Sequence, residues 1–181
     1  ISGSAAATTG NLTKAGAGTL ILTGTNLQTG VVTISAGTLS VGAIGNGLST
    51  SSNLSAATNA NTNLVFAGGT LKVTSDSSSD RAFTINTGAT ATIDVSSGVT
   101  VTLAGATGAS TNGALTKTSA GILNLTGTNT YSGNTTISAG TLAITSTGSL
   151  SGTSAGVYSG AIAIGSGATF KYSSSTNQTL Q

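Results

Sequence analysis

Apolar and polar residues alternate in short runs along most of the chain, and glycine, asparagine or serine bounds each run. Such alternation is typical of strands with one buried face. The clearest runs are Leu20–Leu22, Val32–Ile34, Leu71–Val73, Ile93–Val95 and Val99–Leu103. No window shows the apolar spacing of an amphipathic helix, and the abundant threonine and serine are mediocre helix formers. The pattern therefore predicts an all-β protein with almost no helix.

Two long stretches of the chain are nearly identical. Residues 12–41 and 115–144 share 19 of 30 positions without a gap and lie 103 residues apart. Inside the first copy, Ala17–Leu20 recurs as Ala36–Leu39, and the second copy holds the same echo at the same spacing. A short period nested in a long one is typical of a solenoid.

Each unit of about 19 to 22 residues carries two or three short strands, too few to bury an apolar face alone. Stacking equivalent strands in parallel, at about 4.8 Å per coil, buries that face. We therefore expect residues 1–181 to form a single parallel β-helix segment of roughly seven to nine coils. The loops Gly42–Asn63 and Ser75–Asp80 are expected to protrude from it, and the loop Ala104–Gly113 is expected to lead into the second copy.

The alternation also predicts which side chains point inward. They are Leu20, Leu22, Ile34, Leu39, Val41, Leu71, Val73, Ile93, Val95, Val101, Leu103, Leu123, Leu125, Ile137, Leu142 and Ile144. Aligning the strand around Leu71 with the strand around Ile93 puts Lys72 beside Asp94 on the outer face of adjacent coils. We expect these two charges to pair across the ladder.

Hydroxyl and amide side chains replace charges in this composition. The chain has 36 Thr, 27 Ser, 27 Gly and 13 Asn, but only five Lys or Arg and three Asp or Glu. A net charge of +2 without clustering does not fit a nucleic-acid surface, which needs a basic face. No apolar run approaches the roughly 20 residues of a membrane helix, so we expect no membrane insertion by this segment.

The acidic residues are the candidates for catalysis, because the chain lacks His, Cys and Glu. Asp76, Asp80 and Asp94, with Arg81 next to Asp80, would serve a carbohydrate-active β-helix enzyme if the carboxylates met in a groove. The favoured interpretation is that they are solvated or locally paired charges. Three dispersed carboxylates also make a poor calcium site. We predict no catalytic residue, no cofactor and no metal.

Threonine pairs suggest a third function. Thr90 and Thr92, Thr100 and Thr102, and Thr116 and Thr118 each present two hydroxyls on one strand face, as an ice-binding solenoid would. An ice-binding face needs such pairs stacked on every coil, and the spacings between these pairs are out of phase with the expected coil period. Solvent-facing strand threonine is the favoured explanation.

Lys14 and Lys117 occupy equivalent positions in the two copies, and this repetition predicts a role in a corner of the coil. Neither follows a glycine-rich turn at the spacing of a phosphate-binding loop. The six aromatic residues, three Tyr and three Phe, are expected to fill the core or stack at corners.

The repeated motif resembles a known family. Leu-Thr-Lys at 12–14 and 115–117, the following Ala-Gly-x-Leu-x-Leu-Thr-Gly-Thr-Asn, and Thr-Ile-Ser-Ala-Gly-Thr-Leu are similar to the autotransporter-associated β-strand repeat. The resemblance implies a right-handed β-solenoid in the passenger of a bacterial surface protein. It further implies a non-enzymatic stalk, adhesin or fibre element outside the cell, meeting surface glycans or neighbouring cells.

The two ends are compatible with further coils. Thr179–Gln181 followed by another Ile1–Gly3 would continue the alternation into the next Leu-Thr-Lys motif, and no polar capping element is evident. We expect the segment's main partner to be itself, through continued repeats or head-to-tail stacking. Specific recognition is assigned to the unequal loops, Gly42–Asn63 and Ser75–Asp80.

Overall fold

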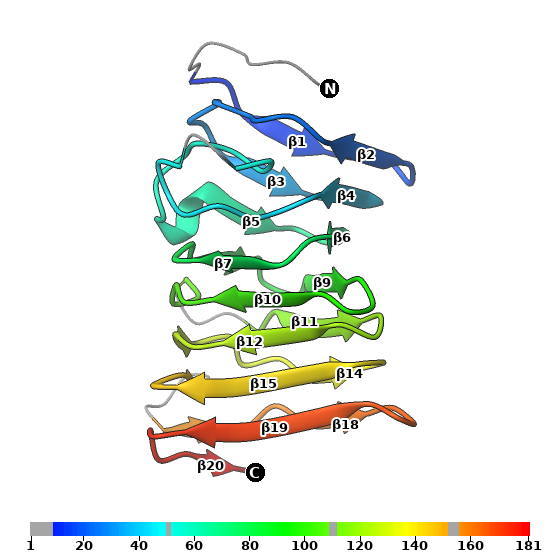
Figure 1. Cartoon of the computed structure of the whole chain (residues 1–181). Coiled ribbons are helices and arrows are strands. Elements are labelled where there is room, and N and C mark those ends of the chain that lie inside the picture. The colour runs from blue at the N-terminus through cyan, green and yellow to red at the C-terminus, as the bar shows by residue number, and fades with distance from the viewer. Residues whose placement is uncertain (1–8, 50–51, 109–111, 152–155) are drawn as a thin grey trace.

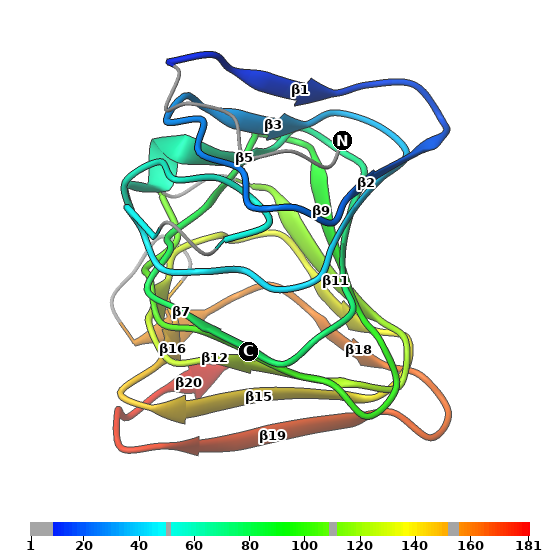
Figure 2. The same ribbon diagram turned by 45° about the horizontal axis from the view of Figure 1, so that its top comes forward.

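The strands stack in parallel around one axis to form a β-helix (Figure 1), seen in a computed structural model that describes residues 9–49, 52–108, 112–151 and 156–181. Strands such as β9 and β11 pass behind the axis to the right and return in front as β10 and β12, so the descending coil is right-handed (Figures 1 and 2). The predicted fold class is confirmed. One 3-10 turn, Asn61–Asn63, interrupts the strands described.

Three sheets form the main faces of the stack. Face A contains β1 (Leu12–Lys14), β3 (Val32–Ile34), β5 (Leu64–Phe66) and β8 (Thr84–Ile85). Face B contains β2 (Thr19–Leu22), β4 (Thr38–Val41), β6 (Thr70–Val73), β9 (Thr90–Val95), β11 (Ala114–Thr118), β14 (Thr135–Ile137) and β18 (Ile162–Ile164). Face C contains β7 (Ser77–Ser79), β10 (Thr100–Leu103), β12 (Ile122–Leu125), β15 (Thr141–Ser146) and β19 (Thr169–Ser174). Two short pairs complete the coils: β13 (Thr128–Asn129) with β16 (Ser149–Leu150), and β17 (Val157–Tyr158) with β20 (Thr179–Leu180).

The inward-facing residues form one apolar core, as the alternation predicts. Every residue of the predicted inward set is buried except Leu20. Leu20 lies on β2, the outermost strand of face B, so only β4 covers it from within the sheet, and it is partly exposed. Four of the six aromatic rings fill the core as expected: Phe66 meets Phe83, and Tyr131 meets Tyr158, both edge to face. Phe170 and Tyr172 are only partly buried against it.

The coils are less uniform than the repeats suggest. The stacked partners on face B are Thr19, Thr38, Thr70, Thr92, Thr116 and Thr136, so the sequence numbers of successive partners differ by 19, 32, 22, 24 and 20. The predicted range of 19 to 22 therefore omits the longer coils. A loop inserted between two strands lengthens its coil without disturbing the ladder, because only the strands determine register.

One segment expected to protrude is a strand of the stack, and another folds back onto the stack. Ser77–Ser79 is strand β7, paired in parallel with Val101–Leu103. Within 42–63, Ile44 and Leu54 are buried, and the Ala56 amide donates to the Gln28 carbonyl of the preceding coil. In the third segment, Thr107 bridges Phe83, while residues 109–111 and the expected start at Ile1–Gly3 lie outside the described residues.

The two copies of the long repeat lie on different faces. In the first copy, Leu12–Lys14 belongs to face A and Thr19–Leu22 to face B. In the second copy, the matching strands β11 and β12 belong to faces B and C. The long period of 103 residues therefore advances the chain by four coils and by one further face. As a result, the same sequence forms two different corners of the coil.

Corner geometry yields a prediction about stability. Ser119 has a φ of 62°, in the left-handed region, where the first copy has Gly16 at 73°. Since this region costs a residue with a Cβ about 1 to 2 kcal/mol, Ser119→Gly should stabilise the protein by about 0.5 to 1 kcal/mol after the extra backbone entropy of glycine. Urea unfolding measures this change. Ser138→Gly, at a corner position without positive φ, should destabilise, and equal effects of the two variants would contradict the explanation.

Candidate functional site

The two equivalent lysines hold corners of the coil from inside. Lys14 is 6% exposed and Lys117 is fully buried. The Lys14 ammonium donates to the carbonyl oxygens of Ala15 at 2.9 Å, Gly16 at 2.8 Å and Ala36 at 3.0 Å. The Lys117 ammonium donates to those of Thr118 at 2.7 Å, Ser119 at 2.7 Å and Ala139 at 3.4 Å. Each ammonium thus binds two carbonyls of its own corner and one of the next coil.

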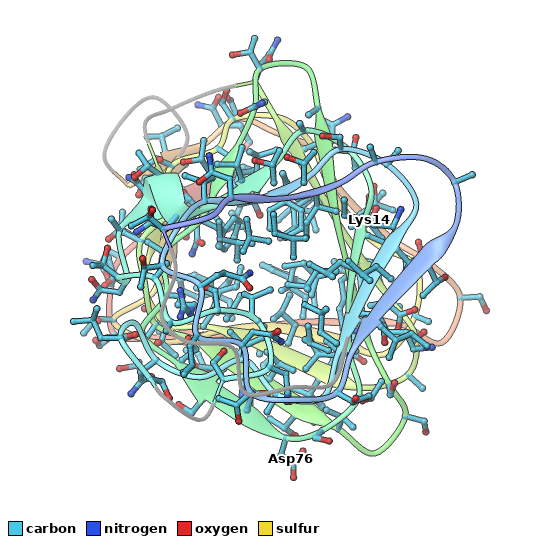
Figure 3. All side chains as sticks on the ribbon, turned by 90° about the horizontal axis from the view of Figure 1, so that it is seen from above. Lys14 and Asp76 are labelled. Atoms are coloured by element: carbon cyan, nitrogen blue, oxygen red, sulfur yellow. The ribbon has the colours of Figure 1, made fainter. Side chains whose placement is uncertain are left out.

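The lysine side chains are part of the core ladder. Lys117 stacks between Ile93 and Ile137 on face B, so its aliphatic stem continues an apolar column. Figure 3, seen down the axis, shows Lys14 at a corner of the stack. The predicted corner role is confirmed, but the burial of the charge is a finding of the structure.

Two asparagines of the repeat also donate to backbone carbonyls, at another corner of the coil. Asn26 donates from its side-chain amide to the carbonyls of Gly24 at 3.1 Å and Asn53. Asn129, its equivalent, donates to those of Gly127 at 2.8 Å and Ser149 at 3.1 Å. Sequence reasoning missed these residues, although the identical Gly-Thr-Asn in both copies was a visible signal.

Burial disfavours the charge on Lys117. Loss of hydration lowers the pKa of Lys117 from 10.5 to about 8, while the negative charge of Asp94 raises it. The buried tyrosines shift the other way, because burial raises the pKa of Tyr131 and of Tyr158. Their hydroxyls share Thr135, at 2.9 Å and 2.7 Å.

Arg81 anchors the inserted loop 42–63. Its side chain is 1% exposed, which overturns the expectation of a solvated loop charge. Its guanidinium donates to the carbonyls of Gly45 at 2.9 Å, Asn46 at 3.2 Å, Ser55 at 2.6 Å and Thr58 at 3.4 Å. The planar fork of arginine suits several carbonyls at once. Burial lowers the pKa of Arg81, and Asp80 opposes that shift.

Asp80 fixes the same loop from outside. Its Oδ1 accepts the Gly47 amide at 2.7 Å, and its Oδ2 accepts the Asn59 side-chain amide at 3.2 Å. The Asp80 amide in turn donates to Asn46 at 3.0 Å. Asp80 and Arg81, at the end of β7, therefore bind both ends of the inserted loop.

The three acidic residues do not meet in a groove. Asp76 projects from the outside of the stack (Figure 3) and accepts the Thr100 amide at 2.7 Å. Asp76 and Asp80 flank β7 on face C, whereas Asp94 lies within β9 on face B. Among the described residues, no three His, Cys, Asp or Glu side chains form a group that could hold a metal ion. In the same part of the chain, no helix is long and apolar enough to cross a membrane.

Lys72 and Asp94 are register partners on face B, as predicted. The expected ion pair is not formed among the described atoms, and Asp94 Oδ1 is buried without a hydrogen-bond partner. Thr92 stacks directly between Thr70 and Thr116, so single threonines do follow the coil period. The threonine pairs themselves do not stack from coil to coil, as predicted, since Thr90 of the pair Thr90 and Thr92 lies beside Ala114.

The ionisation of Lys117 predicts how stability depends on pH. Between pH 8 and about 10 the unfolded chain keeps a proton that folded Lys117 has lost, so the free energy of unfolding should rise by about 1 to 2 kcal/mol. Above about pH 10 the free energy of unfolding should fall. Burial raises the pKa of Tyr131 and of Tyr158, so these residues ionise in the unfolded chain first. Denaturant unfolding across pH 7 to about 11 measures both limbs. Lys117→Met should remove the rise and the exposed Lys171→Met should keep it; a flat wild-type profile would contradict the shift.

The Arg81 anchor predicts a local loosening. Arg81→Met should cost about 2 to 4 kcal/mol, because four carbonyls lose their donor, among them the buried carbonyl of Ser55. Chymotrypsin should then cleave the loop near Leu48 or Leu54, with hydrogen exchange rising there first. Arg81→Lys keeps the charge but lacks the planar fork, so its loss of stability should lie between zero, the value for the wild type, and that of Arg81→Met. Unchanged protection of the loop in Arg81→Met would show that Arg81 does not anchor it.

Comparison with known proteins agrees with these coils. The Passenger-associated-transport-repeat family matches residues 12–41 and 115–144. The chain is 43% identical over 126 residues to the adhesin BmaC autotransporter of Brucella suis biovar 1 (strain 1330), a match over 68% of this chain and 4% of that protein. No solved structure matches the chain. The chain thus carries two passenger-associated transport repeats, the repeat of autotransporter passengers, which are displayed at the cell surface.

Proposed function

We propose that the segment is a non-enzymatic stalk whose coils support an adhesive loop. One observation carries the structural half of this proposal: the distinctive polar residues of the repeat are used inside the coil. Lys117 and Asn129 donate only to backbone carbonyls of their own corner and one neighbouring coil, as do Lys14 and Asn26. Because these polar groups face inward, they stabilise the coil and are not available to bind a partner.

The adhesive half is supported by the relative and by the inserted loop. The Brucella relative is named an adhesin, and this chain spans only a small part of its length. In the loop, Leu48 is 68% exposed and has a φ of 62°. Its amide donates to the Ala57 carbonyl at 2.9 Å, and Asp80 holds the adjacent Gly47. A strained, exposed apolar side chain on an anchored loop fits contact with a partner.

Further coils are the proposed covering of the last one. Ile164 is 53% exposed, whereas Ile137, its partner in the ladder, is fully buried. Leu180 is 46% exposed, whereas Tyr158, its partner in the ladder, is fully buried. An additional coil of the same kind would bury both side chains and pair the free strand edges.

The two alternative functions have less support. The carboxylates of Asp76 and Asp80 accept backbone or side-chain amides, and Asp94 lies on another face. Such an arrangement does not suit the paired acids of a glycosidase, which lie roughly 5 to 10 Å apart across a sugar. An ice-binding face would need more than the single threonine column of face B.

Surface display tests the proposal. Bacteria presenting the segment through an outer-membrane transporter should adhere to epithelial cells more than bacteria presenting the transporter alone. Replacing residues 42–63 by the shorter connection 23–31 of the preceding coil, together with Arg81→Met so that no buried guanidinium is left without acceptors, should abolish the gain at an equal display level. Leu48→Ser should reduce adhesion, and Ile122→Ser, at an exposed apolar residue of face C, should not. Adhesion that survives loop replacement would refute the assignment to this loop.

A further inference from the structure

Face B carries an unbroken column of six threonines. Five ladder steps align Thr19, Thr38, Thr70, Thr92, Thr116 and Thr136, all on the outer side of the sheet. The column persists although the coils between its members differ in length. Threonine–threonine neighbours contribute to sheet stability by themselves, at about 0.2 to 1 kcal/mol per pair. The column alone therefore identifies no partner.

The neighbouring column supplies a second, independent feature. Its members on the four central strands are Ser40, Lys72, Asp94 and Thr118. Lys72 and Asp94 are thus the charges of these two columns, opposite in sign and on adjacent strands. The structure gives them no ion pair with each other. Oδ1 of Asp94 is buried without a hydrogen-bond partner, and the half-buried residue meets the outer surface with the rest of its carboxylate.

Both columns share one centre of symmetry. The midpoint of the threonine column lies between Thr70 on β6 and Thr92 on β9, and the Lys72–Asp94 pair is centred between the same two strands. A two-fold axis in the plane of the face, parallel to the strands and midway between β6 and β9, leaves each column in place and exchanges its two halves. Lys72 of one copy then faces Asp94 of a second copy, and Thr70 faces Thr92.

We propose that face B is a self-complementary surface on which a second copy of this chain docks face to face, with the two solenoid axes antiparallel. With parallel axes, a two-fold axis along the charged column places Lys72 against Lys72 and Asp94 against Asp94, and one midway between the columns places both charges against threonines. Neither position brings Lys72 to Asp94. Like charges in contact disfavour the first position and the second forms no ion pair, so charge selects the antiparallel pairing. A closed two-fold contact of this kind is isologous, with the same patch on both partners.

The size of the surface sets the strength of the contact. Six strands at about 4.8 Å and two outward columns across about 13 Å give roughly 400 Å² per partner as an upper limit, because the sheet twists between β2 and β11 (Figures 1 and 2). A stable pair buries about 800 Å² per partner. The contact of one segment is therefore weak and sensitive to salt. Many such segments on densely packed surface proteins would add their contacts through effective concentration.

Charge exchange tests the geometry. Because the contact is well below the standard size and weak, sedimentation equilibrium of the whole chain is run at concentrations up to about 1 mM, where it should detect dimers. Lys72→Asp alone and Asp94→Lys alone should each weaken association at least tenfold. Mixing these two variants should restore it as a heterodimer, and the double variant K72D/D94K should associate like the wild type. Lys171→Asp on face C, with the same change in net charge as Lys72→Asp, should have no effect.

Three results would overturn the proposal. The first is a wild-type chain that stays monomeric at the highest concentration in low salt. The second is association that neither single charge variant weakens, which would point to the ends of the stack. The third is failure of the mixture to recover association while both variants keep the wild-type circular dichroism and melting temperature. The proposal goes beyond the adhesive role, and loop replacement leaves face B intact, so the two can fail separately.

Discussion

Backbone carbonyls at the corners of the coil must be hydrogen-bonded inside the stack, and the remaining structure depends on this requirement. Strands satisfy their own backbone groups through the ladders, but a chain that turns sharply leaves carbonyls pointing inward, where water is absent. A buried ammonium answers this need well, because it carries three donors and no acceptor. Lys14 and Lys117 each bind two carbonyls of their own corner and one of the next coil. The corner and the stacking interval are thereby fixed together.

Much of the fold follows from alternation and spacing. The spacing that relates Leu71 to Ile93 was enough to align Lys72 with Asp94, because a strand has only two possible parities. Alternation also puts Lys14 on the same side of its strand as Leu12. The rule that charges stay outside argues against that reading, and here the corner carbonyls outweigh it.

Other features depend on contacts that no local pattern records. Ser77–Ser79 has no apolar residue to reveal its parity, and it becomes a strand because Val101–Leu103 offers a ladder. The Arg81 partners lie far earlier in the chain, in a loop whose path no periodicity defines. Sequence therefore predicts the regular coils well. It predicts least where an irregular insertion is fastened to them.

Unequal coils on a regular ladder have a mechanical consequence. The hydrogen bonds between coils run along the axis, so tension between the two ends of a stack loads all bonds of one coil interface together. When one coil detaches, it releases its whole length of chain at about 3.4 Å per residue. The shortest and longest coils of face B, from Thr19 to Thr38 and from Thr38 to Thr70, therefore release about 65 and 110 Å. Under load such a stalk lengthens in discrete, unequal steps and dissipates energy at each one, while the coils that remain keep their shape.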